Sequence, residues 1–542
     1  MKRRNFLRNA SLAGMAMAST PVPGKEHEAY VYDASNPPES FSLMEATISD
    51  MRSRMQSGKL TSRAATQQYL QRIEAVDRKG PGLNSVIEVN PDALKIAERM
   101  DDERRAGKVR GPLHGIPILV KDNIDTADGM MTTAGSLAML GNKASKDAFC
   151  VSRLRAAGAV IIGKTNLSEW ANIRSDNSTS GWSAVGGLTR NPYAIERNTC
   201  GSSSGSGAAV AAGFAWGAIG TETNGSITCP ASINGIVGFK PSVGIVSRTH
   251  VVPISSTQDT AGPMSRTVRD AALLLTAIAG EDKADPVTLE AKRVKDYTEG
   301  LDSYSLQGVR IGVMRSQLGN REDVKAVFST AVADLERAGA LVVDITFEPN
   351  AKMYGDSFTV LMFELREELG KYLASIPAFK EGTTPRTLAD IIAFNTAHSE
   401  EELRWFGQEL FALAQSTTDR ADYETARADA VRIAGKETLD KLLADNKVQF
   451  LIAPTRGPTW VSDLVNGDNF NGSIGFGSPS AIAGYPHLTV PMGAIEGLPI
   501  GLSILGAKWD DHAVLKAGAA YEKARTAKLP APTFRPWRPA ER

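Results

Sequence analysis

Two turns rich in serine and glycine, together with one lysine, form the part of the chain best suited to catalysis. Residues 200–207 read Cys-Gly-Ser-Ser-Ser-Gly-Ser-Gly, and residues 220–226 read Gly-Thr-Glu-Thr-Asn-Gly-Ser. A serine hydroxyl needs a base to accept its proton before it attacks at neutral pH, and no histidine is well placed in these turns. A lysine serves as that base when burial keeps it neutral. Because Lys121 follows the apolar run 116–120, we expect its side chain to point into the protein.

The second turn also offers backbone donors. In a tight turn, the N–H groups of Thr223, Asn224, Gly225 and Ser226 can face one point and stabilise negative charge on a carbonyl oxygen. We therefore predict an oxyanion hole there. Ser203, in the first turn, is expected to form hydrogen bonds within its own loop and to support this geometry.

The segments around these turns predict an α/β fold. Short apolar runs between glycines are typical of strands in a buried sheet; they lie at 116–120, 160–162, 218–221, 236–239, 311–314, 341–345, 450–454, 488–491 and 500–505. Helical patterns alternate with them, for example at 148–157 and 205–214, and residues 320–446 are mostly helical. We expect one mixed sheet assembled from both ends of the chain, with a helix-rich segment inserted between them.

Composition excludes several classes of protein. The 542 residues are 42% hydrophobic and carry 61 basic and 61 acidic side chains, so no overall field attracts nucleic acid or an anionic membrane. No run of about twenty apolar residues is present, which argues against membrane insertion. The three cysteines have no zinc-ligand spacing, and no metal or cofactor is expected. We expect three buried thiols, although a bridge between Cys200 and Cys229 stays open.

The N-terminus resembles an export signal. Arg3-Arg4 precedes a short apolar zone, and Ala16-Met17-Ala18 supplies a cleavage site, as in twin-arginine signal peptides. A disordered basic tail is the alternative. We predict a signal peptide at 1–18, a linker at 19–43 and one catalytic domain at 44–542, with the mature protein periplasmic or secreted.

The motifs together resemble the amidase signature family. Lys121 lies in a G-x-P-x-x-x-K-D segment, Ser202 in a G-S-S loop, and Ser226 ends a T-x-x-G-S turn 24 positions later. The resemblance runs from about Met44 to Ala524. It implies a twisted mixed sheet flanked by helices, with Ser226 as nucleophile, Lys121 as base and Ser202 relaying the proton between them. It also implies a cis peptide bond before Ser202.

Within the family, the chain looks most similar to bacterial peptide amidases, notably at 163–172 and 258–264. That likeness implies hydrolysis of the C-terminal carboxamide of a small peptide to carboxylate and ammonia, by a protein expected to be a monomer. Two positions depart from the common family pattern. Asn224 stands where glycine is usual, and Asn172 replaces a frequent methionine, which makes the predicted acyl-side pocket more polar.

Other interpretations of the same residues are weaker. Residues 158–165 match the P-loop pattern, but the four middle residues are themselves a predicted strand. Residues 201–205 match the G-x-S-x-G nucleophile elbow without a core strand leading into it. His114 and Glu222 are expected to be structural. The functional alternatives are a broad acylamide or fatty-amide amidase and a glutamine-hydrolysing amidotransferase subunit. A catalytically inactive binding protein would not need Lys121, Ser202 and Ser226 together.

Overall fold

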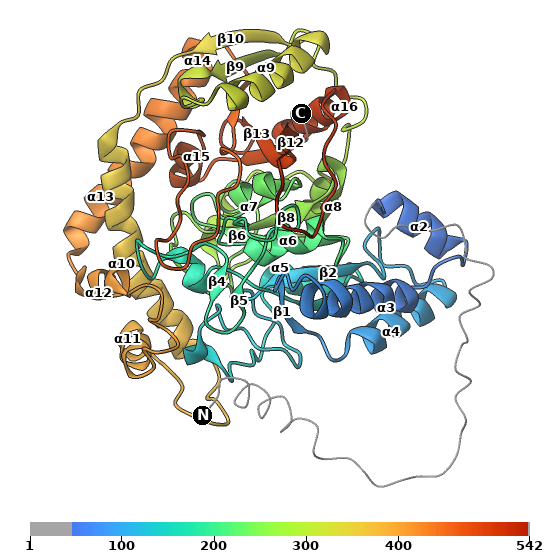
Figure 1. Cartoon of the computed structure of the whole chain (residues 1–542), viewed down its shortest axis with the longest axis vertical. Coiled ribbons are helices and arrows are strands. Elements are labelled where there is room, and N and C mark those ends of the chain that lie inside the picture. The colour runs from blue at the N-terminus through green and yellow to red at the C-terminus, as the bar shows by residue number, and fades with distance from the viewer. Residues whose placement is uncertain (1–45, 540–542) are drawn as a thin grey trace. The chain divides into compact units, whose positions relative to one another are not determined.

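An eleven-stranded mixed sheet organises the chain (Figure 1). The computed structural model describes residues 46–539, so the predicted signal peptide and linker lie outside the described residues. The strand order is β1-β3-β2-β6-β8-β7-β12-β13-β11-β9-β10, and β4 and β5 form a separate two-stranded sheet. The strands are β1 Val86–Val89, β2 Pro117–Lys121, β3 Val160–Thr165, β4 Trp182–Ser183, β5 Gly187–Leu188, β6 Gly217–Glu222, β7 Val237–Lys240, β8 Thr260–Ser265, β9 Arg310–Met314, β10 Leu341–Ile345, β11 Phe450–Pro454, β12 His487–Ile495 and β13 Leu498–Leu505.

Helices account for much of the remaining described chain, and none of those described is long and apolar enough to cross a membrane. The α-helices are α2 Ile48–Gln56, α3 Ser62–Arg72, α4 Ala93–Arg105, α5 Phe149–Ala156, α6 Ser204–Ala211, α7 Thr228–Ile233, α8 Val268–Ile278, α9 Glu322–Arg337, α10 Ala351–Ser375, α11 Leu388–Ala397, α12 Glu409–Ser416, α13 Arg420–Ala434, α14 Lys441–Asp445, α15 Ser478–Ala483 and α16 Asp511–Ala524. The predicted helix-rich segment 320–446 therefore contains α9 to α14 and a single described strand, β10.

The predicted α/β fold is confirmed, with strands from both ends of the chain in one sheet. Each of the nine apolar runs overlaps a strand, whereas β1, β4, β5 and β8 were not predicted. The sequence of β8, Thr-Ala-Gly-Pro-Met-Ser, has no apolar run, and proline is usually kept out of internal strands because it cannot donate to the ladder. Pro263 is tolerated because the pairing of β7 with β8 covers only Met264 and Ser265.

The sheet brings the lysine and both turns together. Strands β2 and β6 are parallel neighbours, with Val120 opposite Ile219, so their carboxyl ends meet at one edge. Lys121 ends β2, and the turn leading to Ser226 follows β6. Helix α6 begins directly after the first turn and lies against the chain at Ser85 and Asn166. A Cβ atom on Gly205 would lie 2.3 Å from the Ser85 carbonyl oxygen, so this close approach requires glycine.

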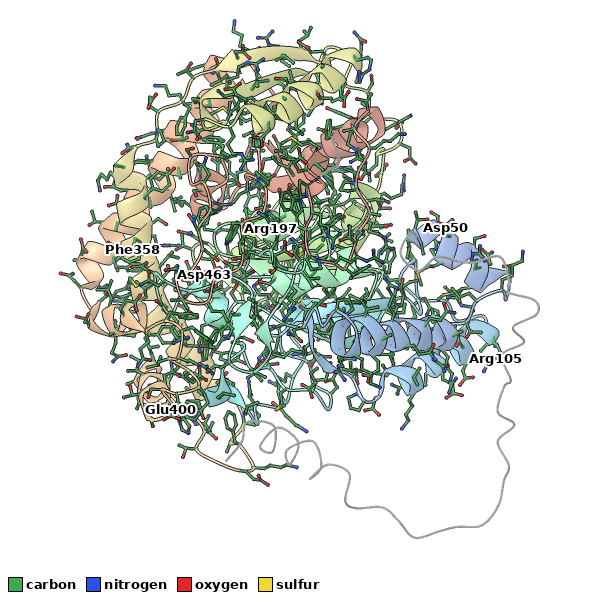
Figure 2. All side chains as sticks on the ribbon, in the orientation of Figure 1. Asp50, Arg105, Arg197, Phe358, Glu400 and Asp463 are labelled. Atoms are coloured by element: carbon green, nitrogen blue, oxygen red, sulfur yellow. A yellow bond between two sulfur atoms is a disulfide. The ribbon has the colours of Figure 1, made fainter. Side chains whose placement is uncertain are left out.

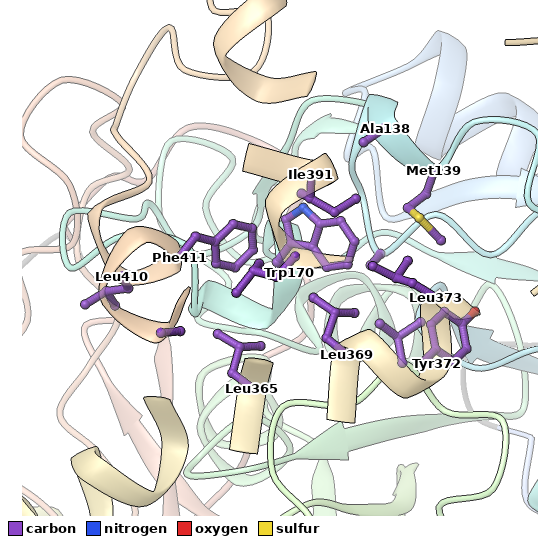
Figure 3. Close-up of a cluster of buried hydrophobic side chains, with 14 of the residues drawn as sticks. Ala138, Met139, Trp170, Leu365, Leu369, Tyr372, Leu373, Ile391, Leu410 and Phe411 are labelled. Carbon is purple, nitrogen blue, oxygen red and sulfur yellow. The ribbon is translucent and has the colours of Figure 1, made fainter. Parts of the chain in front are cut away.

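The helix-rich segment packs against the chain next to the site through a buried apolar cluster (Figure 3). Trp170 lies at its centre, with the Phe411 ring centroid 5.9 Å away in an edge-on arrangement. Other members come from α10, α11 and the segment around residue 138; among them are Met139, Leu365, Leu369, Leu373 and Ile391. Trp170, Ala171 and Asn172 all have positive φ angles, between 47° and 69°, which is unfavourable for non-glycine residues. Burial of the Trp170 ring therefore helps to hold this turn in place.

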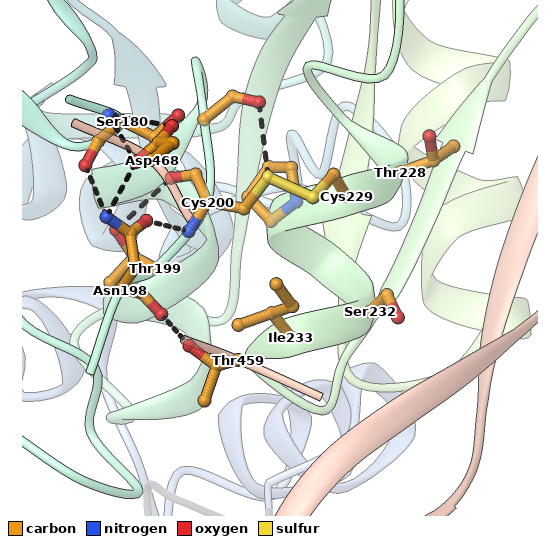
Figure 4. The surroundings of a disulfide bond; sticks show 12 residues. Ser180, Asn198, Thr199, Cys200, Thr228, Cys229, Ser232, Ile233, Thr459 and Asp468 are labelled. Carbon is orange, nitrogen blue, oxygen red and sulfur yellow. Dashed lines mark hydrogen bonds between the residues drawn. A yellow bond between two sulfur atoms is a disulfide. The ribbon is translucent and has the colours of Figure 1, made fainter. Parts of the chain in front are cut away.

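The expectation of three free thiols was wrong. Cys200 and Cys229 form a disulfide, and Cys150 is the free, buried thiol (Figure 4). The bridge joins the segment before Ser202 to helix α7 after Ser226, and it lies in a small apolar cluster with Ile233 and Trp460. The sequence could not settle the pairing because a 29-residue separation is compatible with either state. A loop of this length typically contributes about 2–4 kcal/mol to stability when it is closed by a bridge.

Candidate active site

Lys121 is fully buried, and its amine meets three oxygen atoms. Its Nζ lies 2.7 Å from Ser202 Oγ, 2.9 Å from Thr221 Oγ1 and 3.3 Å from the Thr221 carbonyl oxygen. Asn123 also donates to Thr221 Oγ1, at 2.9 Å, and so fixes that hydroxyl. The structure thus brings together two of the three predicted catalytic side chains, and it adds Thr221, for which no role was predicted.

Burial changes the charge state of this lysine. Desolvation lowers the pKa of Lys121 from 10.5 to about 7, although the negative charges of Asp259 and Glu222 oppose this shift. Lys121 makes no ion pair with any residue that the structure describes. At a pKa of about 7, roughly half of the amine is neutral at pH 7, whereas an exposed lysine would be almost wholly protonated.

The first turn is held by hydrogen bonds on both sides of Ser202. The peptide bond between Gly201 and Ser202 is cis, and the Ser202 carbonyl oxygen accepts from the Ser168 N–H at 3.1 Å. Ser203 Oγ donates to the Thr221 carbonyl oxygen at 3.0 Å and accepts from the Thr221 N–H at 3.2 Å. The Ser203 N–H donates to the Ser226 carbonyl oxygen at 3.1 Å. Ser203 therefore joins the two turns directly.

The second turn leaves its donors free. The N–H groups of Thr223, Asn224, Gly225 and Ser226 have no hydrogen-bond acceptor among residues 46–539. The same is true of the Ser226 hydroxyl, and Ser226 is 9% exposed. Gly225 has a φ of 87°, which suits glycine, and no atom lies within 4 Å of a Cβ placed there. The Ser226 hydroxyl and the free N–H groups of the turn therefore lie next to one another, with unfilled space beside Gly225.

Two carboxylates brace this turn. Glu222 Oε2 accepts from the N–H groups of Ile227 and Thr228, at 2.8 and 3.0 Å, as expected for a structural acceptor. Asp259 Oδ1 accepts from Thr223 Oγ1 at 2.6 Å, and its Oδ2 accepts from the N–H groups of Ile254 and Ser255. Burial raises the pKa of Asp259 to about 6. Asp259 was not among the predicted site residues, although it lies in the 258–264 stretch that carried the closer resemblance.

Two separate cavities are each lined by a predicted site residue, Thr223 or Asn172. One of about 300 Å³ is lined by Asn123, Thr221, Thr223 and Asp259, and by Ala171. Asn172 lies instead on a cavity of about 370 Å³ together with Asp468 and Phe470, and its side chain donates to Ser180 Oγ at 3.0 Å. Adjacent residues of one strained turn therefore face separate cavities.

The competing motifs have structural explanations. Residues 160–165 of the P-loop match form strand β3, and Lys164 Nζ donates to the Ile124 and Met131 carbonyl oxygens. His114 is buried, with Nε2 at 2.8 Å from the Met100 carbonyl oxygen. Among residues 46–539, no three His, Cys, Asp or Glu side chains are grouped so that they could hold a metal ion.

Known proteins share this architecture. The Amidase family model matches residues 64–515. The native peptide amidase of Stenotrophomonas maltophilia superposes with a TM-score of 0.85 at 49% identity, over 90% of this chain and 99% of that one. A probable amidase of Arabidopsis thaliana is 38% identical over 91% of this chain and 92% of its own length. A glutamyl-tRNA(Gln) amidotransferase subunit of Symbiobacterium thermophilum is 35% identical over 86% of this chain and 94% of its own.

The family match spans most of the chain, and the fold is shared over nearly the whole length of a solved relative. The chain therefore belongs to the amidase signature family and is an amide-hydrolysing enzyme.

Proposed function

We propose that this amidase hydrolyses the C-terminal carboxamide of peptides, with Ser226 as nucleophile, Ser202 as proton relay and Lys121 as base. The observation that carries the mechanism is the buried Lys121 amine at 2.7 Å from Ser202 Oγ. A neutral amine has two N–H bonds and one lone pair. The two Thr221 oxygens accept the N–H bonds, and the lone pair is left to accept the Ser202 proton.

In the proposed first half-reaction, Ser226 Oγ attacks the amide carbon and passes its proton to Ser202 Oγ. Ser202 passes its own proton to Lys121 Nζ, which becomes an ammonium. The carbonyl oxygen gains negative charge and is stabilised by free N–H groups of the second turn, those of Thr223, Asn224, Gly225 and Ser226. One missing donor in such a site typically costs about 3–4 kcal/mol of transition-state stabilisation.

Collapse of the tetrahedral intermediate breaks the carbon–nitrogen bond. The leaving nitrogen takes a proton back through Ser202 from Lys121 and departs as ammonia, which leaves an acyl ester on Ser226. Water then attacks this ester with the same relay as base. Its products are the peptide carboxylate and the free Ser226 hydroxyl, and no cofactor is consumed.

The substrate proposal rests on similarity and on the character of the pocket. The chain is 49% identical to a peptide amidase but 35% identical to the amidotransferase subunit. Because of its similarity to the amidotransferase subunit, glutamine hydrolysis is the second candidate function. We take the cavity that contains Asn172 and Asp468 as the acyl side of the site, and these polar side chains favour a peptide over a fatty chain, which needs a long apolar channel.

Export through the twin-arginine signal at residues 1–18 remains part of the proposal. The Cys200–Cys229 disulfide supports it, because structural bridges persist in oxidising compartments such as the periplasm and are rare in the cytosol. A small peptide amide is the proposed partner in that compartment, with the enzyme acting as a monomer.

The first prediction concerns the three side chains. Ser226→Ala should abolish ammonia release, and Ser202→Ala or Lys121→Ala should each lower kcat by at least about 10³-fold. Because the groups act as one unit, the Ser202→Ala/Lys121→Ala double variant should be little worse than either single variant. Initial rates on a peptide amide, with circular dichroism as a control for folding, test this. Near-normal turnover by Ser226→Ala would contradict the mechanism.

The second prediction concerns the substrate. Ammonia release should be fastest from a C-terminally amidated dipeptide and much slower from oleamide and from free glutamine at equal concentration. Internal peptide bonds should stay intact, as checked by mass spectrometry of the products. A clear preference for oleamide or glutamine would reject the peptide-amide assignment and leave the catalytic proposal in place.

The third prediction concerns export. Replacing Arg3 and Arg4 with lysine should leave the full-length protein in the cytoplasm, whereas the unchanged chain should yield a shorter periplasmic form. Cell fractionation followed by N-terminal sequencing distinguishes the two. Normal periplasmic accumulation of the double-lysine variant would exclude the twin-arginine route.

A further inference from the structure

A third cavity, of about 370 Å³, lies beside the disulfide and has no role in the proposed chemistry. Its wall is formed by residues 456–463 and 469–471, together with Arg197 and Arg321. Figure 2 labels Arg197 and Asp463, two of the lining residues. Trp460 belongs both to this wall and to the apolar cluster around the bridge. The cavity is therefore built on the same framework that supports Ser202 and Ser226.

Arg456 is the unusual group in this cavity. Within residues 46–539 its guanidinium makes no hydrogen bond and no ion pair, and its Nε is enclosed without a partner. The guanidinium carbon lies 4.3 Å from the ring centroid of Phe470, so the side chain is held against an aromatic face. Burial lowers the pKa of Arg456, but an arginine side chain remains charged in proteins. The side chain as a whole is only partly buried, so its guanidinium N–H groups can meet a partner in the cavity.

The other charges around the cavity do not supply that partner. Arg321 is already paired with Asp323, and the Asp463 carboxylate accepts from the N–H groups of Val465 and Asn466 within its own loop. The Arg197 guanidinium donates to the Thr459 carbonyl oxygen and lies over the Trp537 ring, with no carboxylate paired to it among the described residues. Ser462 Oγ is a further enclosed hydroxyl without a partner. The wall thus presents excess positive charge and unused donors.

The cavity also adjoins the one that contains Asn172, through a shared residue. Glu222, which braces the turn before Ser226, and Asp468 are the acidic groups whose charges act on Arg456. Phe470 lines both this cavity and the one that contains Asn172. Trp460 Nε1 donates to Asp468 Oδ1 at 3.1 Å, and Asp468 in turn accepts from the Ser180 N–H. A peptide bound at Ser226 that reaches the Asn172 cavity would come next to Phe470 and thus to Arg456.

We propose that this cavity is a subsite for an acidic side chain of the peptide substrate, with Arg456 binding its carboxylate while Phe470 holds the guanidinium in place. The planar fork of an arginine matches a carboxylate through two parallel hydrogen bonds, which a single point charge cannot do. This inference rests on the proposed peptide-amide activity. It narrows the substrate class to peptides with a glutamate or aspartate upstream of the amidated residue.

The test compares glutamate with glutamine, which has a similar shape but no charge. Acetylated tetrapeptide amides carry one or the other at the first, second or third position upstream of the amidated residue, and kcat/KM is measured from ammonia release. In the unchanged enzyme, one position should favour glutamate by about tenfold. Arg456→Met should reduce that ratio to about one and leave kcat/KM for the glutamine peptide within about twofold, which also shows that the variant is folded.

Arg321→Met is the matched control, because it removes an arginine from the same wall that is already paired with Asp323. It should retain the glutamate preference. The proposal is overturned if no position favours glutamate in the unchanged enzyme, or if the preference survives in Arg456→Met. Thermal stabilisation by free glutarate without any glutamate preference would place a free anion in the cavity and would likewise reject the substrate assignment. Turnover of the glutamine peptides reports on peptide-amide activity separately.

Discussion

The burial of Lys121 with no carboxylate partner among the described residues is the constraint on which the rest of the site depends. An amine in this position loses its hydration, and its pKa falls to about 7 because the distant acidic charges compensate only in part. Strand β2 achieves this by placing the lysine at its carboxyl end, inside the sheet and beside Thr221 of the parallel strand β6. The neutral amine would be useless if it were mobile. The two Thr221 oxygens and Ser202 Oγ therefore define one orientation for it.

The same geometry explains why the two turns next to Lys121 are held by so many contacts. The turn with Ser202 and the turn with Ser226 come from different segments, and their relative position must be fixed to within a fraction of an ångström for proton transfer. Ser203 joins them through hydrogen bonds, the Cys200–Cys229 bridge joins their outer ends, and Asp259 holds Thr223 from the far side. Asp259 also raises the pKa of Lys121, so it influences both the shape and the charge of the site.

Sequence patterns predicted the fold class and the core strands because buried strands carry continuous apolar runs, as at 116–120 and 450–454. They could not predict β8, whose glycine and proline are tolerated only because of how its neighbours pair. The motif spacing brought Lys121, Ser202 and Ser226 into one hypothesis. The sequence did not predict roles for Thr221, Asp259 and Arg456, because their importance lies in contacts between distant segments. A lone threonine, aspartate or arginine gives no periodic signal. The Cys200–Cys229 bridge was left open as an alternative for the same reason.

The pH dependence of kcat/KM for a peptide amide, measured in parallel for the unchanged enzyme and Asp259→Asn, tests the central claim most directly. Only the neutral amine accepts a proton, so activity should rise with pH to a plateau, with a midpoint near 7 and a tenfold fall per pH unit below it. Removing the negative charge of Asp259 should move the midpoint to lower pH, because that charge favours the ammonium form. A midpoint near the ordinary lysine value, or complete loss of the pH dependence in Asp259→Asn, would contradict the assignment of Lys121 as the base.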